Sequence, residues 1–190
     1  MTFHTHHRLL LAVAGLSFFV LTLIIGIVPA FQIQSTPALS KAKKLSRGER
    51  RGRALYMKEG CGYCHTQFVR NLPMDQAYGR PSVAGDYARE DPPMLGTQRT
   101  GPDLANVAKR QPSDIWHLIH LYNPRAVVPQ SVMPGYPWYF EVKSKAEKGD
   151  RVVPVPEAFA PPDGQVVVAL EPARDLVKYL LTLRQAELGP

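Results

Sequence analysis

The chain begins with a long apolar segment, and amphipathic stretches and proline-rich loops follow it. No charged residue occurs between Leu9 and Phe31, and about 20 apolar residues are enough for a helix to cross the hydrocarbon core of a membrane. A cleaved secretory signal is the competing interpretation, because Arg8 precedes the segment and Val28-Pro29-Ala30 resembles a cleavage site. The segment is longer than a signal core of about 7 to 15 residues. We therefore favour a retained anchor.

This pattern divides the chain into four predicted parts. Residues 1–8 form an N-terminal cytoplasmic tail, 9–33 a transmembrane anchor, 34–44 a linker and 45–190 a single folded domain. The total of 190 residues leaves room for one ordinary domain with extensions. No internal repeat indicates a second domain.

The first predicted helix of the domain runs from Leu45 to Lys58. Ser46 is suited to cap its beginning, and Gly60 is suited to end it. It leads directly to Cys61. A second helix is predicted after Pro112-Ser113-Asp114.

A third helix is predicted to start at Pro172, where a row of leucines gives it an apolar face. We expect this face to pack against the helix before Cys61. A short strand is predicted for Val166 to Leu170. The prediction is therefore a mainly α protein: one N-terminal transmembrane helix followed by a folded domain with long loops.

Between Thr66 and Gln98 the chain contains many prolines and glycines and no sustained period. Long loops in a compact domain are usually functional when they are ordered. This stretch is therefore a candidate docking surface, with Tyr78, Val83 and Tyr87 as its candidate contact residues.

The net charge of +7 and the isoelectric point near 9.5 raise the question of nucleic-acid binding. No RNA- or DNA-binding signature accompanies the scattered basic residues, so no nucleic-acid partner is expected. Much of the charge lies between Lys41 and Arg53, where it can meet lipid headgroups or an acidic partner.

Two cysteines, Cys61 and Cys64, are followed at once by His65. The spacing Cys-x-x-Cys-His is typical of c-type haem attachment, because two thiols bind the haem vinyl groups and the histidine ligates iron. A redox pair or half of a zinc site would use the same cysteines. However, no thioredoxin-like βαβ pattern or second cysteine pair is present. One covalent haem c is predicted, and residues 45–190 are therefore predicted to be a class I, monohaem cytochrome c domain.

The sixth iron ligand is predicted to be Met133, which lies in a proline-stiffened loop after the motif. His117 and His120 remain the alternative, as ligands of a bis-histidine haem. The Pro102 carbonyl is a candidate acceptor for the Nδ1 hydrogen of His65. Two arginines that flank the haem-contacting loops, Arg99 and Arg125, are candidate partners for the haem propionates.

The chain resembles the monohaem cytochrome c subunit (subunit II) of cbb3-type haem-copper oxidases. The resemblance covers the anchor ending at Pro29, the motif segment Glu59–Gln67, Tyr78–Gly85, Arg99–Ala105 and the stretch from Trp116 through Arg125 to Trp138. After Trp138 it fades, and it returns in the C-terminal helix.

The resemblance implies that His65 and Met133 are the axial ligands. It also implies that electrons pass through this haem to a large multi-span subunit that reduces oxygen. The chain itself would then be a non-catalytic electron-transfer subunit of an oxidase complex, with another cytochrome c subunit or a soluble cytochrome as its donor. A calcium ion shared with the large subunit near Gly96-Thr97 is a further implied feature, although the family has serine where this chain has Thr97.

Three other functions stay open: the cytochrome subunit of a nitric oxide reductase, a stand-alone membrane-anchored electron shuttle, and a haem sensor of a gas. The positive-inside rule alone would place the basic flank of the anchor in the cytoplasm. Long domains translocate despite such charge, and c-type haem is attached outside the bacterial cytoplasmic membrane. We therefore expect a single-pass protein of the inner membrane with its haem domain on the periplasmic face.

Overall fold

The N-terminal apolar segment is a continuous helix in the computed structural model, which describes residues 6–39, 44–162 and 164–186. Helix α1 (His7–Leu21) passes through a π-helical stretch (Thr22–Ile27) into α2 (Val28–Gln34). Within the helix His7–Gln32 an 18-residue window has a mean hydropathy of 2.7, and the helix is long and apolar enough to cross a membrane. Residues 1–5 of the predicted tail and 40–43 of the predicted linker lie outside the described residues.

The chain divides into two compact units, residues 1–42 with 83–90 and residues 43–82 with 91–190. In the first unit, the short helix α4 (Ala84–Tyr87) lies on the chain that follows the anchor. The amide of Leu39 donates to the Gly85 carbonyl at 3.2 Å. A Cβ atom on Gly85 would stand 3.1 Å from Cγ of Leu39. Part of the predicted docking loop is thus bound to the residues next to the anchor.

Helix α3 (Arg47–Lys58) begins the second unit with a capping box. The Ser46 hydroxyl accepts from the Glu49 amide at 3.4 Å, and the Glu49 carboxylate accepts from the Ser46 amide at 2.6 Å. Gly60 ends the helix with φ +68°, a left-handed conformation that glycine adopts without strain. The predicted helix, its cap and its end are confirmed, and the chain is delivered directly to Cys61.

Helix α7 (Glu171–Leu180) packs across α3, as the sequence predicts. The two backbones approach closely at Gly52, where a Cβ atom would stand 1.9 Å from the Asp175 carbonyl oxygen. Beside this crossing, the rings of Tyr56 and Tyr179 meet edge to face with centroids 5.6 Å apart. A glycine and two aromatic rings therefore fix how the helices cross.

Helix α6 (Asp114–Tyr122) is capped by Ser113, whose hydroxyl accepts from the Trp116 amide at 3.2 Å. The short helix α5 (Val107–Arg110) precedes it. The 3-10 helices of this unit are Cys61–Tyr63, Pro73–Tyr78, Pro124–Ala126, Pro137–Tyr139 and Glu157–Phe159. These elements and α7 enclose a core that includes Tyr56, Leu104, Leu118, Leu121, Leu176 and Tyr179.

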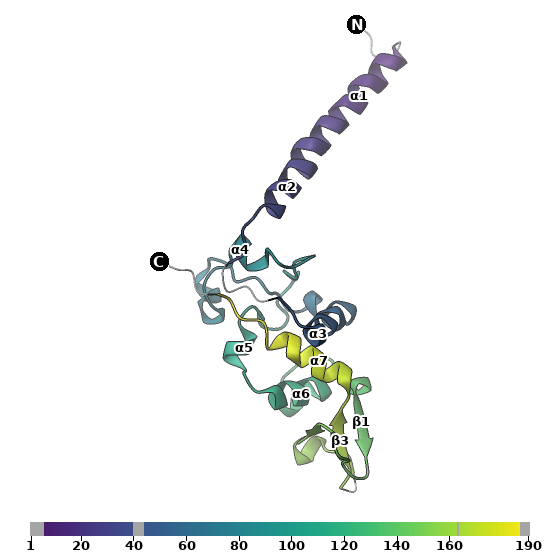
Figure 1. The fold of residues 1–190 in the computed structure, drawn as a ribbon, viewed down its shortest axis with the longest axis vertical. Coiled ribbons are helices and arrows are strands. Elements are labelled where there is room, and N and C mark those ends of the chain that lie inside the picture. Colours follow the sequence, from purple (N-terminus) through teal and green to yellow (C-terminus); the bar gives the residue numbers. More distant parts are fainter. Residues whose placement is uncertain (1–5, 40–43, 163, 187–190) are drawn as a thin grey trace. The chain divides into compact units, whose positions relative to one another are not determined.

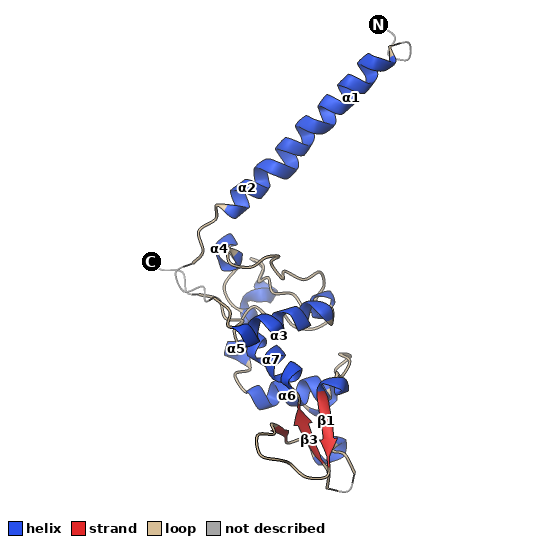
Figure 2. Cartoon of the chain, turned by 45° about the vertical axis from the view of Figure 1, so that its right-hand side comes forward, coloured by secondary structure: helices blue, strands red, loops and turns tan. Residues whose placement is uncertain are grey.

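A small antiparallel sheet occupies the region where the family resemblance fades. Its strands are β1 (Phe140–Lys143), β2 (Val152–Val153) and β3 (Val166–Ala169), in the order β1-β3-β2. Phe140 pairs with Ala169, and Val153 pairs with Val167. Figure 2 shows β1 and β3 side by side. The predicted strand at residues 166–170 is confirmed as β3, whereas β1 and β2 were not predicted.

Candidate haem-binding site

The sequence Cys-x-x-Cys-His forms a tight turn directly after α3. The 3-10 helix Cys61–Tyr63 carries the first cysteine, and the amides of Cys64 and His65 donate to the Cys61 carbonyl at 3.2 and 3.0 Å. Cys61 is half-buried, Cys64 is exposed, and neither forms a disulfide. One turn of chain therefore presents two free thiols and an imidazole together.

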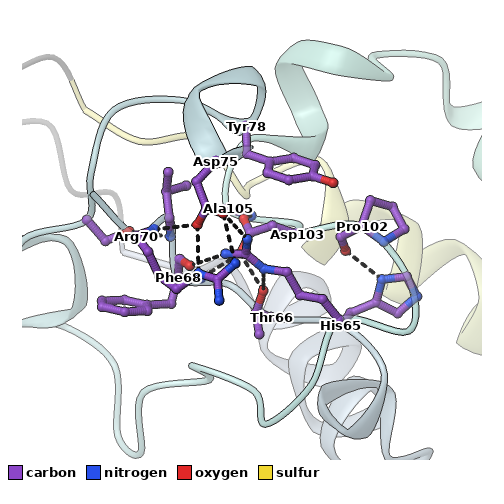
Figure 3. Close-up of polar contacts among 12 residues, drawn as sticks. His65, Thr66, Phe68, Arg70, Asp75, Tyr78, Pro102, Asp103 and Ala105 are labelled. Carbon is purple, nitrogen blue, oxygen red and sulfur yellow. Dashed lines mark hydrogen bonds and ion pairs between the residues drawn. The ribbon is translucent and has the colours of Figure 1, made fainter. Parts of the chain in front are cut away.

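The imidazole of His65 is fixed by the loop that contains Pro102. Its Nδ1 atom lies 2.8 Å from the Pro102 carbonyl oxygen (Figure 3). A carbonyl only accepts hydrogen bonds, so Nδ1 carries the hydrogen and Nε2 keeps the lone pair that a metal needs. Burial lowers the pKa of His65, which favours this neutral form. The predicted hydrogen bond is present, while ligation of iron stays a prediction.

The surroundings of His120 show independently whether the region near His65 suits a cofactor. Its ring stacks on Trp116 with centroids 4.8 Å apart and an interplanar angle of 13°. The Nδ1 atom is buried and has no hydrogen-bond partner among the described residues. Burial, followed by the charges of His117 and His65, lowers the pKa of His120 to about 4. A neutral ring with a free polar atom, within electrostatic reach of His65, fits a bound group such as haem c.

The loop that carries Met133 is attached to the end of α6. The Tyr136 amide donates to the Leu121 carbonyl at 2.8 Å, and the Met133 amide donates to the Ser131 hydroxyl at 3.2 Å. A Cβ atom on Gly135 would stand 2.7 Å from the Tyr122 carbonyl oxygen. Met133 is partly buried against the core. The backbone of this loop is thus held in a defined place, and the role of Met133 as axial ligand stays a prediction.

The two arginines proposed for the propionates differ in their surroundings. The guanidinium of Arg99 contacts Asp75, Asp103 and Thr66. Arg125 is exposed, lies in the 3-10 helix Pro124–Ala126, and forms no ion pair within the described part of the chain. Contact with a propionate stays a prediction for both residues. The geometry offers Arg99 partners that the sequence did not indicate.

The turn at Gly96-Thr97 packs on the haem motif. A Cβ atom on Gly96 would stand 2.3 Å from the His65 carbonyl oxygen, and the Thr97 amide donates to the Gly62 carbonyl at 3.0 Å. No group of three or more His, Cys, Asp or Glu side chains suited to a metal is found among the described residues. A shared calcium ion at this turn stays a prediction.

Two buried carboxylates beside the motif were missed by sequence reasoning. Asp75 and Asp103 have no exposed surface, and both contact Arg99 (Figure 3). Hydrogen bonds from Arg70, followed by those from Arg99, hold the pKa of Asp75 well below its usual range. Asp103 lies in the segment Arg99–Ala105 that resembles the family. Asp75 is isolated in a proline-rich loop, and no sequence pattern there indicates that it is buried.

Tyr78 lies in the same cluster, and its role in docking stays a prediction. The guanidinium carbons of Arg99 and Arg110 lie 5.3 and 4.9 Å from the centroid of its ring. Such cation–π contacts contribute about 0.5 to 2 kcal/mol each. Tyr78 therefore differs from Val83 and Tyr87, which belong to the unit of the anchor.

The family comparison agrees with this geometry. A family model described as cytochrome c oxidase, mono-heme subunit/FixO matches residues 2–163. The chain belongs to this family. The match includes the apolar helix, the Cys-x-x-Cys-His turn, the Met133 loop and most of the region after Trp138 where the resemblance had faded. Comparison with curated proteins gave no match.

Membership of the family assigns the chain to the mono-haem cytochrome subunits of cbb3-type oxidases, and so to electron transport. It implies one haem c and association with the catalytic subunit of the oxidase. It also agrees with the helix His7–Gln32 as the anchor of a membrane-bound oxidase subunit.

Proposed function

We propose that the chain passes single electrons through one covalently bound haem c to a multi-span haem-copper subunit that reduces oxygen. The observation that carries this proposal is the hydrogen bond between His65, in the Cys-x-x-Cys-His turn, and the Pro102 carbonyl of a separate loop. It orients a neutral imidazole beside two free thiols, which is the donor set of a c-type haem. The unit formed by residues 43–82 and 91–190 is then a class I cytochrome c domain.

Each residue has one task in this proposal. When haem c is bound, Cys61 and Cys64 would form the thioether bonds and His65 would donate Nε2 to the iron. Met133 would donate its thioether to the same iron. A full set of protein ligands leaves no open iron position for a substrate, so the chain transfers electrons and the reduction of oxygen takes place in its partner.

The first unit places the chain on the bilayer and beside its partner. The anchor crosses the inner membrane once, with its N-terminal tail in the cytoplasm and its haem domain on the periplasmic face. Residues 83–90 are bound to residues 37–39, which follow the anchor within a few positions. This location supports residues 83–90 as a docking surface for the large subunit. The electron donor is another cytochrome c subunit or a soluble cytochrome.

Purification of the native complex from membranes tests this function. The expected result is a chain with one covalent haem c that copurifies with a multi-span subunit containing haem and copper. A partner with non-haem iron in place of copper would assign the chain to a nitric oxide reductase. A haem-loaded chain that copurifies with no multi-span subunit would indicate a stand-alone shuttle. We expect carbon monoxide to leave the ferrous spectrum unchanged, because protein ligands would leave no iron position open. A changed spectrum would indicate an open iron position and hence a gas sensor.

A further inference from the structure

Two backbone hydrogen bonds join the segment that contains His65 to the segment that contains Pro102, one on each side of His65 along the chain. Before it, the Gly101 amide donates to the Cys64 carbonyl at 2.9 Å. After it, the Leu104 amide donates to the Thr66 carbonyl at 2.7 Å. The bond from His65 to Pro102 therefore lies between two backbone bonds that join the same segments. Its length and direction depend on how firmly these segments are held together.

The hydroxyl of Thr66 strengthens this junction. It donates to a carboxylate oxygen of Asp103 at 2.7 Å and accepts from Nε of Arg99 at 2.7 Å. The single hydroxyl hydrogen is thus committed to Asp103, so both bonds have fixed directions. The same Asp103 oxygen accepts from the Phe68 amide at 2.8 Å. One side chain therefore ties the residue after His65 to the residue after Pro102.

Asp75 holds the outer end of the cluster. Its carboxylate contacts the Arg99 guanidinium and accepts from the amide and Nη2 of Arg70 at 2.7 and 2.9 Å. Arg99 also donates to the Phe68 carbonyl at 2.6 Å. The Arg99 guanidinium thus contacts Asp75, Asp103 and the Thr66 hydroxyl, and Figure 3 labels these two aspartates and Thr66 together with His65. The network connects the 3-10 helix Pro73–Tyr78 to the haem-motif loop without touching the imidazole.

We propose that Thr66, Asp75, Arg99 and Asp103 are positioning residues that set the His65–Pro102 hydrogen bond and, through it, the reduction potential of the haem. The proposal rests on the proposed function only in taking His65 as the iron ligand. A well-aligned Nδ1–H···O bond raises the basicity of the imidazole, and a more basic ligand favours ferric iron. Loosening the network should therefore raise the potential.

Thr66→Val is the decisive variant, because it removes the bridging hydroxyl with little change of shape or charge. Thr66→Ser keeps the hydroxyl and is the rescue. Asp75→Asn is a second variant, although the loss of an anion alone would also raise the potential. Asp150→Asn is the matched control. That carboxylate accepts from the Glu147 amide at 2.9 Å and from Lys143 at 3.1 Å, in the loop between β1 and β2.

The full-length chain in detergent is examined by haem content, redox titration and electron paramagnetic resonance of the ferric state. The g values follow axial-ligand orientation and do not respond to a remote charge. We expect one covalent haem in every variant, a raised potential in Thr66→Val, shifted g values in Thr66→Val and Asp75→Asn, and wild-type behaviour in Thr66→Ser and Asp150→Asn. Wild-type g values in both Thr66→Val and Asp75→Asn would overturn the proposal. If the Thr66→Val protein does not accumulate in the cells that produce it, the g values of Asp75→Asn alone test the proposal. Shifted values then support it, and wild-type values overturn it.

Failure of the proposed function would look different. A wild-type chain without covalent haem, or one whose iron is not ligated by His65, would be recognised before any variant is compared. A haem-loaded wild type with insensitive Thr66 and Asp75 variants would leave the electron-transfer function standing and remove only the positioning role.

Discussion

Gly101 lies against the imidazole of His65, so closely that a Cβ atom on Gly101 would stand 2.3 Å from Cε1 of the ring. No real Cβ tolerates that distance, so Gly101→Ala must displace the ring or the loop. Overpacking of this kind costs about 1 to 3 kcal/mol. Because displacement breaks the bond to Pro102, we expect less covalent haem and an altered visible spectrum, as measured by haem stain and absorption. In Gly62→Ala the new Cβ would meet Gly96 at 3.9 Å, an ordinary contact. Equal haem content in the two variants would contradict this account.

Local signals predicted much of the site and of the helical framework. Ser46 with Glu49, Gly60 and Pro112-Ser113 are cap and stop signals that act within a few residues, and the helices begin and end where these signals predict. The Cys-x-x-Cys-His motif could be recognised because its spacing reflects haem chemistry. These features depend on neighbouring residues in the chain. The Pro102 acceptor lies 37 positions from His65 and could be predicted only because cytochromes commonly place a Gly-Pro turn beside this histidine.

The strand pairing of the sheet and the acidic cluster depend on distant residues and were not predicted, although the strand β3 itself was. β1 pairs with a strand more than 20 residues away, and nothing within Phe140–Lys143 specifies that partner. Asp75 is buried only because Arg70 and Arg99 neutralise it, and an aspartate in a proline-rich loop is ordinarily solvated. The contacts of Arg99 and Arg110 with the Tyr78 ring were not predicted either, because these three residues are far apart in the chain.

The crossing of α3 and α7 allows a paired test of helix packing. Gly52→Ala places a Cβ atom 1.9 Å from the Asp175 carbonyl oxygen, which belongs to the backbone and cannot rotate away. We expect a clear fall in the melting temperature, because the helices must separate and the loss exceeds the gain of about 1 kcal/mol in helix propensity. Gly48→Ala meets the side chains of Asp175 and Lys178, with 2.9 Å to the carboxylate oxygen. These ends can move, so thermal unfolding should change little. A smaller fall in Gly52→Ala than in Gly48→Ala would refute the close crossing.

Asp75 should make the folded domain sensitive to acid. Its pKa in the folded chain is lowered, first by Arg70 and then by Arg99, whereas an unfolded aspartate titrates near pH 3.9. The unfolded chain therefore binds the proton more readily, and stability from this group is present above about pH 4 and is lost as the pH falls further. The free energy of unfolding in urea, measured between pH 6 and 3, should fall more steeply with decreasing pH in the wild type than in Asp75→Asn. If the free energies of unfolding of the two proteins fall in parallel, the ion pairs of Asp75 with Arg70 and Arg99 do not lower its pKa.

Replacement of the sixth ligand should change the potential without removing the haem. In Met133→His the thioether gives way to an imidazole, which favours ferric iron more strongly. We expect covalent haem at the normal yield, a lower midpoint potential in redox titration, and loss of the methionine-to-iron absorption band. Met57→Leu is the control, because Met57 is 43% exposed on α3. An unchanged potential and band in Met133→His would remove Met133 from the ligand set.

Residues 83–90 should be needed for assembly and not for haem attachment. They are bound to Pro37 and Leu39 in the unit of the anchor, and Val83 is 37% exposed. Ordering a polar loop in this place has an entropic cost that contacts with a membrane partner can offset. The double variant Val83→Ser/Tyr87→Ser should therefore yield normal covalent haem and less copurifying large subunit, as judged by quantitative gels of the detergent-solubilised complex. Val142→Ser is the matched control, since Val142 is 46% exposed on β1 and belongs to the other unit. If the double variant copurifies with its partner at the yield of Val142→Ser and reduces it at the normal rate, residues 83–90 are not the docking surface.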